Sequence, residues 1–210
     1  MQWQDIDEFK GIGISSKATD TFRQHIEARG HEVSTAYWDG MERHLLNVSA
    51  RRGAVLLDAS KVTEHLFFVC HGVAASIQTS PGGDEQIARF FEYGHLCSNL
   101  TSAWHHVIGD DQLIAMSDFL GVRIPFSMFR DEFFSEGPLS LYWREMAFET
   151  LLFDKDLICA KTIRNVETRY RFLAERYENV VSSVPDKYIA RFLGITPQAL
   201  SRFLKNHRKT

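Results

Sequence analysis

The chain has 210 residues, of which 44% are hydrophobic and 24% charged, with a formal net charge of −3. This length and apolar content allow one large domain, or a medium and a small one, with a packed core. No segment approaches the ~18 apolar residues of a membrane-spanning helix, and the start, Met1–Asp5, lacks the charged and apolar regions of a signal peptide. We therefore expect a cytoplasmic protein without a membrane partner.

The three cysteines, Cys70, Cys97 and Cys159, are far apart and odd in number. Because there is no CxxC pair, we expect reduced thiols and no zinc or iron–sulphur site. The sequence also has no Ser/His/Asp or Cys/His set at a familiar spacing and no phosphate-cradling glycine loop. We therefore predict no catalytic residues, no metal and no cofactor, and hence a protein that is not an enzyme.

Charge is distributed unevenly along the chain. From Ala160 to Thr210 there are 11 Lys and Arg residues and four Asp and Glu residues, a net charge of +7, which leaves −10 for the rest. A basic terminal region on an acidic body favours phosphate contacts at one end only.

Residues 1–52 are predicted to be an N-terminal helical segment, because Phe22 and Ile26, then Met41 and Leu45, follow helical spacing.

Residues 53–136 change to short apolar runs separated by turn residues, and Pro81–Asp84 has the composition of a hairpin turn. Closely spaced antiparallel strands of this kind predict a barrel or a jelly-roll-like β-roll.

A long helix is predicted for residues 137–161. Its residues recur at spacings of four and three, as in a heptad seam: Leu139, Trp143, Met146, Thr150, Phe153, Leu157 and Ala160. A second apolar set, Ala147, Leu151 and Ile158, lies on another face. One helix with two apolar faces can pack on its own domain and on a partner, so we expect a dimerisation helix and a homodimer. The alternative is a helix buried wholly within a monomer.

Residues 162–210 contain the most informative pattern, a helix-turn-helix. The small Ala190 precedes Gly194 by four residues, and Leu200 follows Gly194 by six. Two helices that cross at a tight turn need a small residue at their contact, a glycine that can adopt a left-handed conformation, and an apolar residue that anchors the second helix. Thr196 and Pro197 supply an N-cap and a first-turn proline for that helix.

The order of these parts resembles the Crp/Fnr family of bacterial transcription regulators. The resemblance extends from about Ala54 onward and is sharpest in Val184–Ala190 and Leu193–Arg202; Phe67–Gly72 and Phe90–Gly94 resemble strands of the family's roll. It implies an α+β fold with an antiparallel, jelly-roll-like β-roll, a long dimerisation helix and a C-terminal helix-turn-helix domain. It also implies a homodimer bound to double-stranded DNA and leaves a contact with RNA polymerase open.

The departures from the family concern its effector site. Cyclic-nucleotide-binding members carry a Gly-Glu-Leu step shortly after the glycine that matches Gly94, and a later arginine that meets the phosphate. This chain has Ser98–Leu100 and Gly109–Asp111 at these places. Two carboxylates would repel a phosphate by roughly 1 kcal/mol or more each. Gly94, Ser98 and Asn99 are therefore candidate residues of an effector pocket that has lost cyclic-nucleotide binding, and the effector is an unknown small molecule or none.

The candidate DNA contacts lie on the second helix of the motif. Gln198 can pair with an adenine edge and Arg202 with guanine, each discriminating by ~1–3 kcal/mol. Ser201 and Lys205 suit phosphate contacts, as does the helix N-terminus at Thr196. If residues 139–160 pair two chains, the target is an inverted repeat with half-sites about one helical turn apart, ~10 base pairs.

Two other functions stay open from the residues alone. A cupin-like, metal-dependent small-barrel enzyme would use the histidines of the strand region, which are His65, His71, His95, His105 and His106. Against it, no His-x-His with a downstream glutamate is present. The other alternative is a ligand-binding module whose terminal helices serve assembly and do not bind DNA.

Overall fold

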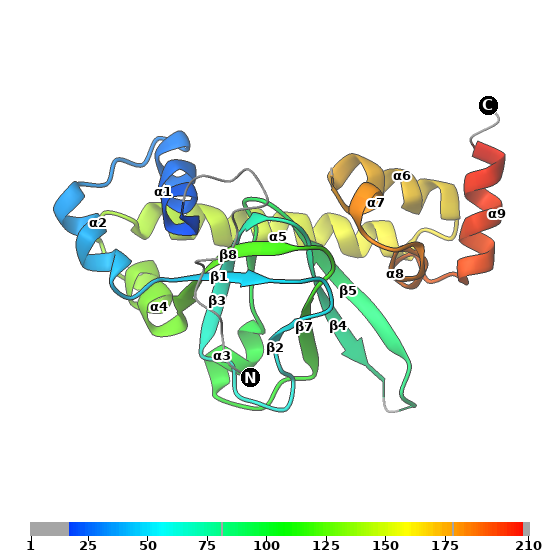
Figure 1. Cartoon of the computed structure of the whole chain (residues 1–210), viewed down its shortest axis with the longest axis horizontal. Helices are drawn as coiled ribbons and strands as arrows, with labels where there is room; N and C mark the ends of the chain where they lie inside the picture. The colour runs from blue at the N-terminus through cyan, green and yellow to red at the C-terminus, as the bar shows by residue number, and fades with distance from the viewer. Residues whose placement is uncertain (1–16, 81, 178, 208–210) are drawn as a thin grey trace.

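The computed structural model describes residues 17–80, 82–177 and 179–207. Figure 1 shows three regions along the long axis of the molecule. Helices α1 (Ala18–Ala28), α2 (Thr35–Glu42) and α4 (Phe126–Phe134) lie at one end, the β-strands lie in the middle, and a small helical unit lies at the other end. Helix α5 (Ser140–Thr162) runs along the axis and links all three.

The N-terminal segment is helical only in part. Both α1 and α2 form where the sequence predicts helix, and Ser34 caps α2 by accepting a hydrogen bond from the Tyr37 N–H at 3.3 Å. Residues 46–50, however, form strand β1 (Leu46–Ala50), which pairs with β8. The roll therefore begins before residue 53, and the predicted boundary at 52 is wrong, because Val48 is buried between the sheets. The first 16 residues lie outside the described part.

The β-roll is a pair of four-stranded antiparallel sheets, with strand orders β1-β8-β3-β6 and β2-β7-β4-β5. The remaining strands are β2 (Val55–Leu57), β3 (His65–His71), β4 (Ala74–Thr79), β5 (Glu85–Phe91), β6 (Leu96–Cys97), β7 (Asp111–Ala115) and β8 (Phe119–Pro125). This architecture confirms the predicted jelly-roll-like, α+β class. Residues that alternate along the strands face each other between the sheets, among them Phe67, Val69, Leu113 and Phe119.

A glycine makes the β3–β4 turn possible. Gly72 has φ +81°, and a Cβ at this position would overlap the carbonyl oxygen of Asp118. Only glycine tolerates both the left-handed conformation and the close approach.

The long helix α5 buries five of the seven predicted heptad residues inside its own chain, and Thr150 and Phe153 are half-buried. Leu139, Trp143, Met146, Leu157 and Ala160 are all buried in the monomer. The expectation that this seam joins two chains is therefore wrong. The opposite face instead exposes five large apolar residues: Leu141, Phe148, Leu151, Leu152 and Ile158. Without Leu152, their spacings are seven, three and seven, as in a heptad pattern.

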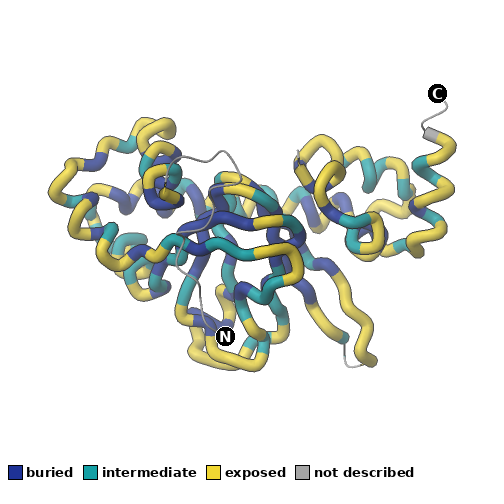
Figure 2. Tube along the Cα trace, viewed as in Figure 1, coloured by how far each residue is buried: buried dark blue, intermediate teal, exposed yellow. Residues whose placement is uncertain are grey.

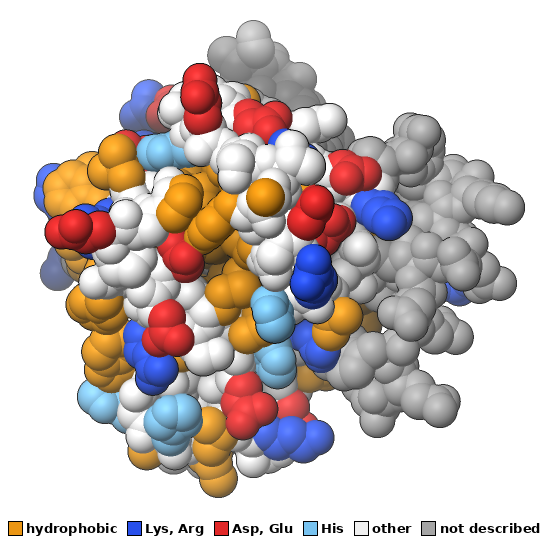
Figure 3. Space-filling model, turned by 90° about the vertical axis from the view of Figure 1, so that its left-hand side faces the viewer, with side chains coloured by type: hydrophobic (Ala, Val, Ile, Leu, Met, Phe, Trp, Pro, Cys, Tyr) orange, Lys and Arg blue, Asp and Glu red, His pale blue; other side chains and the backbone are white. Residues whose placement is uncertain are grey.

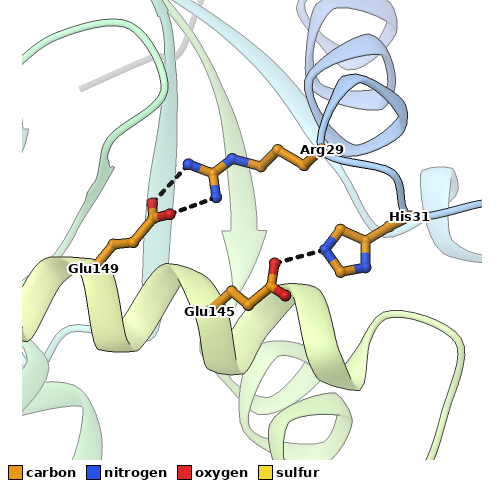
Figure 4. Close-up of polar contacts among 4 residues, drawn as sticks. All are labelled: Arg29, His31, Glu145 and Glu149. Carbon is orange, nitrogen blue, oxygen red and sulfur yellow. Dashed lines mark hydrogen bonds and ion pairs between the residues drawn. The ribbon is translucent and has the colours of Figure 1, made fainter.

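Two polar contacts attach the N-terminal helices to α5 (Figure 4). The guanidinium of Arg29 donates to both carboxylate oxygens of Glu149, at 2.8 and 2.6 Å. One turn earlier on α5, Glu145 lies 2.8 Å from the ring Nε2 of His31. At this end of the molecule acidic, basic and hydrophobic side chains are intermixed on the surface (Figure 3).

The C-terminal unit consists of α6 (Val166–Arg176), α7 (Val180–Ser183), α8 (Asp186–Phe192) and α9 (Pro197–His207). Helix α6 begins after Asn165, whose side chain accepts from the Glu167 and Thr168 N–H groups. The short α7 was not predicted. The unit has one hydrophobic core in common with the outer face of β4 and β5, where Ile87 and Phe90 contact it.

Among the described residues, no helix has both the length and the hydrophobicity needed to cross a lipid bilayer.

Phe90→Ala tests whether the roll and the C-terminal unit unfold together. Phe90 is fully buried, and its ring centroid lies 5.2 Å from that of Phe192 and 5.9 Å from that of Tyr177. We expect a loss of about 3–5 kcal/mol in the free energy of unfolding, because the cavity would lie in a core that both parts use. Urea unfolding followed by fluorescence and circular dichroism should give one transition at a lower midpoint. Phe134→Ala is the control, since that ring is 65% exposed. Two separate unfolding transitions in the urea curve of the wild type would contradict the shared core.

Candidate DNA-binding helix and ligand cavity

The turn between α8 and α9 has the geometry that the sequence predicts. Ala190 is fully buried at the helix contact, and Gly194 takes a left-handed conformation with φ +64°. The N–H of Ile195 then donates to the Ala190 carbonyl at 3.0 Å, which closes the end of α8. Thr196 caps α9, since its hydroxyl accepts from the Ala199 N–H at 3.2 Å.

Helix α9 has one apolar and one polar face. Leu200 is fully buried, and Phe203 and Leu204 pack beside it against the unit's core. The predicted DNA contacts, Thr196, Gln198, Ser201, Arg202 and Lys205, are all exposed, on the helix that forms one end of the molecule (Figures 1 and 2). Within the described residues no acidic side chain pairs with Arg202 or Lys205.

Polar contacts hold the C-terminal unit against strand β5. Arg191 of α8 pairs with Glu85 at 2.5 Å, and the Asn179 N–H donates to Glu92 at 2.9 Å. Near the end of α5, Lys161 Nζ donates to the carbonyls of Ile87 and Ala88, at 3.2 and 2.5 Å. These contacts and the shared core determine where α9 lies relative to the roll.

A cavity of about 430 Å³ lies between the roll and α5. This volume is within the range of small-molecule sites. Most of the lining is apolar, and its polar members are Ser76, Arg89, Ser98, Asp111, Thr150, Asp154 and Lys161. Arg89 is 7% exposed, and its Nη1 donates to Asp154 on α5 at 2.6 Å.

The three predicted pocket residues do not share one site. Ser98 lines this cavity and donates to the His65 carbonyl at 2.8 Å. Asn99 caps α3 (Leu100–His105) by accepting from the Ser102 N–H, and its amide donates to Asp111. Gly94, with φ +84°, instead lines a second cavity of about 490 Å³ beside α1 and α6.

Sequence reasoning missed Arg89 and Lys161. Arg89 interrupts the otherwise apolar run Ile87–Phe91, which is a signal that could have been noticed. No local signal marks Lys161, because its cavity partners are more than 70 residues away in the chain.

The histidines of the strand region do not gather. In the part of the chain that the structure describes, no three His, Cys, Asp or Glu side chains form a group that could hold a metal ion. His105 and His106 end helix α3 and are not in a strand. His95 instead accepts the Glu92 N–H on Nδ1 at 3.1 Å, so its proton is on Nε2.

No protein-family model matches this sequence, and no curated protein matches it in sequence. Comparison of folds does find neighbours: the chain has the fold of the Crp/Fnr family of regulators.

Three solved structures illustrate this likeness. FixK2 from Bradyrhizobium japonicum has a TM-score of 0.66 and 16% sequence identity, over 79% of this chain and 85% of that one. A CooA variant from Carboxydothermus hydrogenoformans has a TM-score of 0.60 and 16% identity, over 88% and 84%. CLP from Xanthomonas campestris, described as a c-di-GMP-responsive global regulator, has a TM-score of 0.58 and 14% identity, over 80% and 88%. At such identities the likeness shows the fold.

His95→Gln tests the effect of acid on the site. Burial, and secondarily the charge of Arg89, lower the pKa of His95 from its ordinary 6.5 to about 4. Between these two values the unfolded chain binds a proton that the folded chain does not. The folded state therefore loses stability as pH falls from about 6.5 to about 4, and keeps it above 6.5.

We expect the free energy of unfolding in urea to decrease less on acidification for His95→Gln than for the wild type. Part of the decrease should remain, because burial also lowers the pKa of His25 to about 4. His71→Gln, at an exposed end of β3, is the matched control. If the free energy of unfolding decreased equally with falling pH in His95→Gln and in the wild type, this explanation would be refuted.

Proposed function

We propose that the protein is a sequence-specific, DNA-binding transcriptional regulator of the Crp/Fnr type and not an enzyme. The observation that carries this proposal is the exposed polar face of α9, on a helix whose other face is anchored in the core. A helix presented in this way can enter the major groove. The net charge of +7 from Ala160 onward supports phosphate contacts at the same end.

We assign DNA binding to residues 162–210 and sensing to the roll, which starts near residue 46. Gln198 and Arg202 are the proposed base contacts, and Thr196, Ser201 and Lys205 the proposed phosphate contacts. Whether RNA polymerase is a further partner is a separate hypothesis. The selection of duplexes from a random DNA pool at physiological salt tests the proposal: an enriched inverted repeat is expected, and no enrichment with or without added ligand would contradict it.

The exposed face of α5 is the proposed homodimer contact. Leu141, Phe148, Leu151 and Ile158 occupy four of the six positions of a heptad seam that runs from residue 141 to residue 158, and Arg144 and Lys155 occupy the other two. A second copy is the occupant that explains this spacing, because a parallel pair of α5 helices would place two α9 helices for an inverted repeat.

The cavity between the roll and α5 is the proposed effector site. Cyclic-nucleotide binding in the family's manner is not expected there, because Asp111 lies in the lining and accepts from Ser76 at 2.6 Å. A cyclic phosphate placed next to Asp111 would be repelled by this carboxylate.

Arg202→Ala tests the proposed base contact. We expect the affinity for the selected site to fall by ~1–3 kcal/mol and one base preference in each half-site to relax. Lys205→Ala should weaken binding to all sequences about equally and reduce the salt dependence, because a phosphate contact carries no sequence information. Competition between selected and scrambled duplexes distinguishes the two. Unchanged selectivity in Arg202→Ala would refute its assignment.

Phe148→Glu tests the proposed dimer. A charge on the exposed α5 face should give monomers at micromolar concentration in analytical ultracentrifugation, and binding to the full repeat should become no tighter than to a half-site. Phe134→Glu is the matched control, because Phe134 and Phe148 are 65% and 61% exposed on different helices. A dimer that persists in Phe148→Glu, or that Phe134→Glu abolishes, would exclude this interface.

A further inference from the structure

Most polar groups that line the cavity are already paired with one another. Arg89 donates through Nη1 to Asp154, although its buried Nε has no partner among the described residues, Ser76 donates to Asp111, and Ser98 donates to a backbone carbonyl. The rest of the wall is largely apolar and includes Leu66, Phe91, Leu96, Leu157 and Ile158. A ligand of this cavity must therefore be apolar over most of its surface.

Lys161 is the basic group of this lining that has no carboxylate partner among the described residues. Its ammonium donates to two neutral carbonyls of β5 and lies 4.9 Å from the ring centroid of Phe192. No carboxylate of the described residues lies within ion-pair distance of it, and Asp154, whose charge favours the ammonium, is paired with Arg89. Burial lowers the pKa of Lys161, which indicates that its charge is incompletely compensated.

We propose that this cavity binds a small organic acid with an apolar body and a single negative charge, and that Lys161 binds the acid group. One ammonium without an anionic partner, at the wall of an apolar cavity, is the chemical complement of such a ligand. The carboxylates of Asp111 and Asp154 belong to the same lining and would repel a second negative charge. This inference rests on the proposed effector role of the cavity and specifies the class of effector.

The position of Lys161 also links the cavity to the DNA-binding unit. Phe192, which Lys161 contacts, is the last residue of α8, and Ile87 and Ala88 belong to the strand against which α8 packs. An acid group that draws the ammonium away from these partners would change the contact between roll and helix-turn-helix.

Two fluorescent probes of nearly equal shape test the ligand class. Anilinonaphthalene sulfonate carries one negative charge, and N-phenylnaphthylamine has the same ring system without the sulfonate. Both would be titrated into the full chain. We expect the wild type to bind the sulfonate about tenfold or more tightly than the neutral probe, as a charge-assisted hydrogen bond warrants.

Variants at Lys161 then separate charge from shape. Lys161→Gln keeps a donor for the β5 carbonyls but removes the charge, so it should lose the preference for the sulfonate and keep the affinity for the neutral probe. Lys161→Arg should retain the preference. Lys155→Gln, on the same helix but outside the cavity lining, should behave like the wild type. Ala147→Phe, which fills the cavity, should weaken the binding of both probes.

Several outcomes would overturn the proposal. These are equal affinities of the wild type for both probes, a sulfonate preference that persists in Lys161→Gln, and binding that Ala147→Phe leaves unchanged. Circular dichroism and thermal unfolding of each variant establish that it is folded. DNA selection without probe is an independent measurement, so a negative probe result with an enriched operator would reject the ligand class alone and leave the proposed regulator intact.

Discussion

Strand β5 is the physical link on which the arrangement of this protein depends. It is the edge of its sheet, and an edge strand presents peptide groups without a neighbouring strand. Here the C-terminal unit and Lys161 cover that edge. Because the strand pairs Arg89 with Ser76 but Ile87 with Ile77, Ala88 has no opposite residue and the strand contains a bulge. The bulge lets Ile87 and Phe90 face the C-terminal unit while Arg89 and Phe91 line the cavity.

Helix α5 connects β5 to the N-terminal helices at the other end of the molecule. Its first half packs on the N-terminal helices through Trp143 and through the Arg29–Glu149 pair, and its last turns reach β5 through Leu157 and Lys161. A helix fixed at so many points keeps little freedom to rotate. The face that it leaves exposed is therefore a defined surface, and its apolar residues stand in one row.

These two elements give the proposed regulator a physical basis. The helix-turn-helix is not suspended from a free linker, since its core includes residues of the roll. The cavity lies next to β5, the strand against which α8 packs. A change in the cavity would therefore reach the DNA-binding unit by direct contact, which would couple sensing to DNA binding. The distribution of charge is consistent with this division, with a basic terminal region and an acidic remainder.

The residues by themselves determined the helix-turn-helix and the general order of roll, long helix and terminal unit. The four residues of the turn, Ala190, Gly194, Thr196 and Leu200, lie within a few residues of one another. The local sequence therefore shows what each contributes to the turn, and the structure agrees with it. Two features were decided only by tertiary structure. One is which face of α5 is buried, and the other is which side chains of β5 face the C-terminal unit and which line the cavity. Both faces of α5 carry apolar residues at similar spacing, so only long-range packing can select between them. In β5 a single bulge reverses the alternation that sequence reading assumes. Lys161 lines the cavity together with residues of the roll that are distant in the chain, such as Ser76 and Asp111, because α5 packs on the roll.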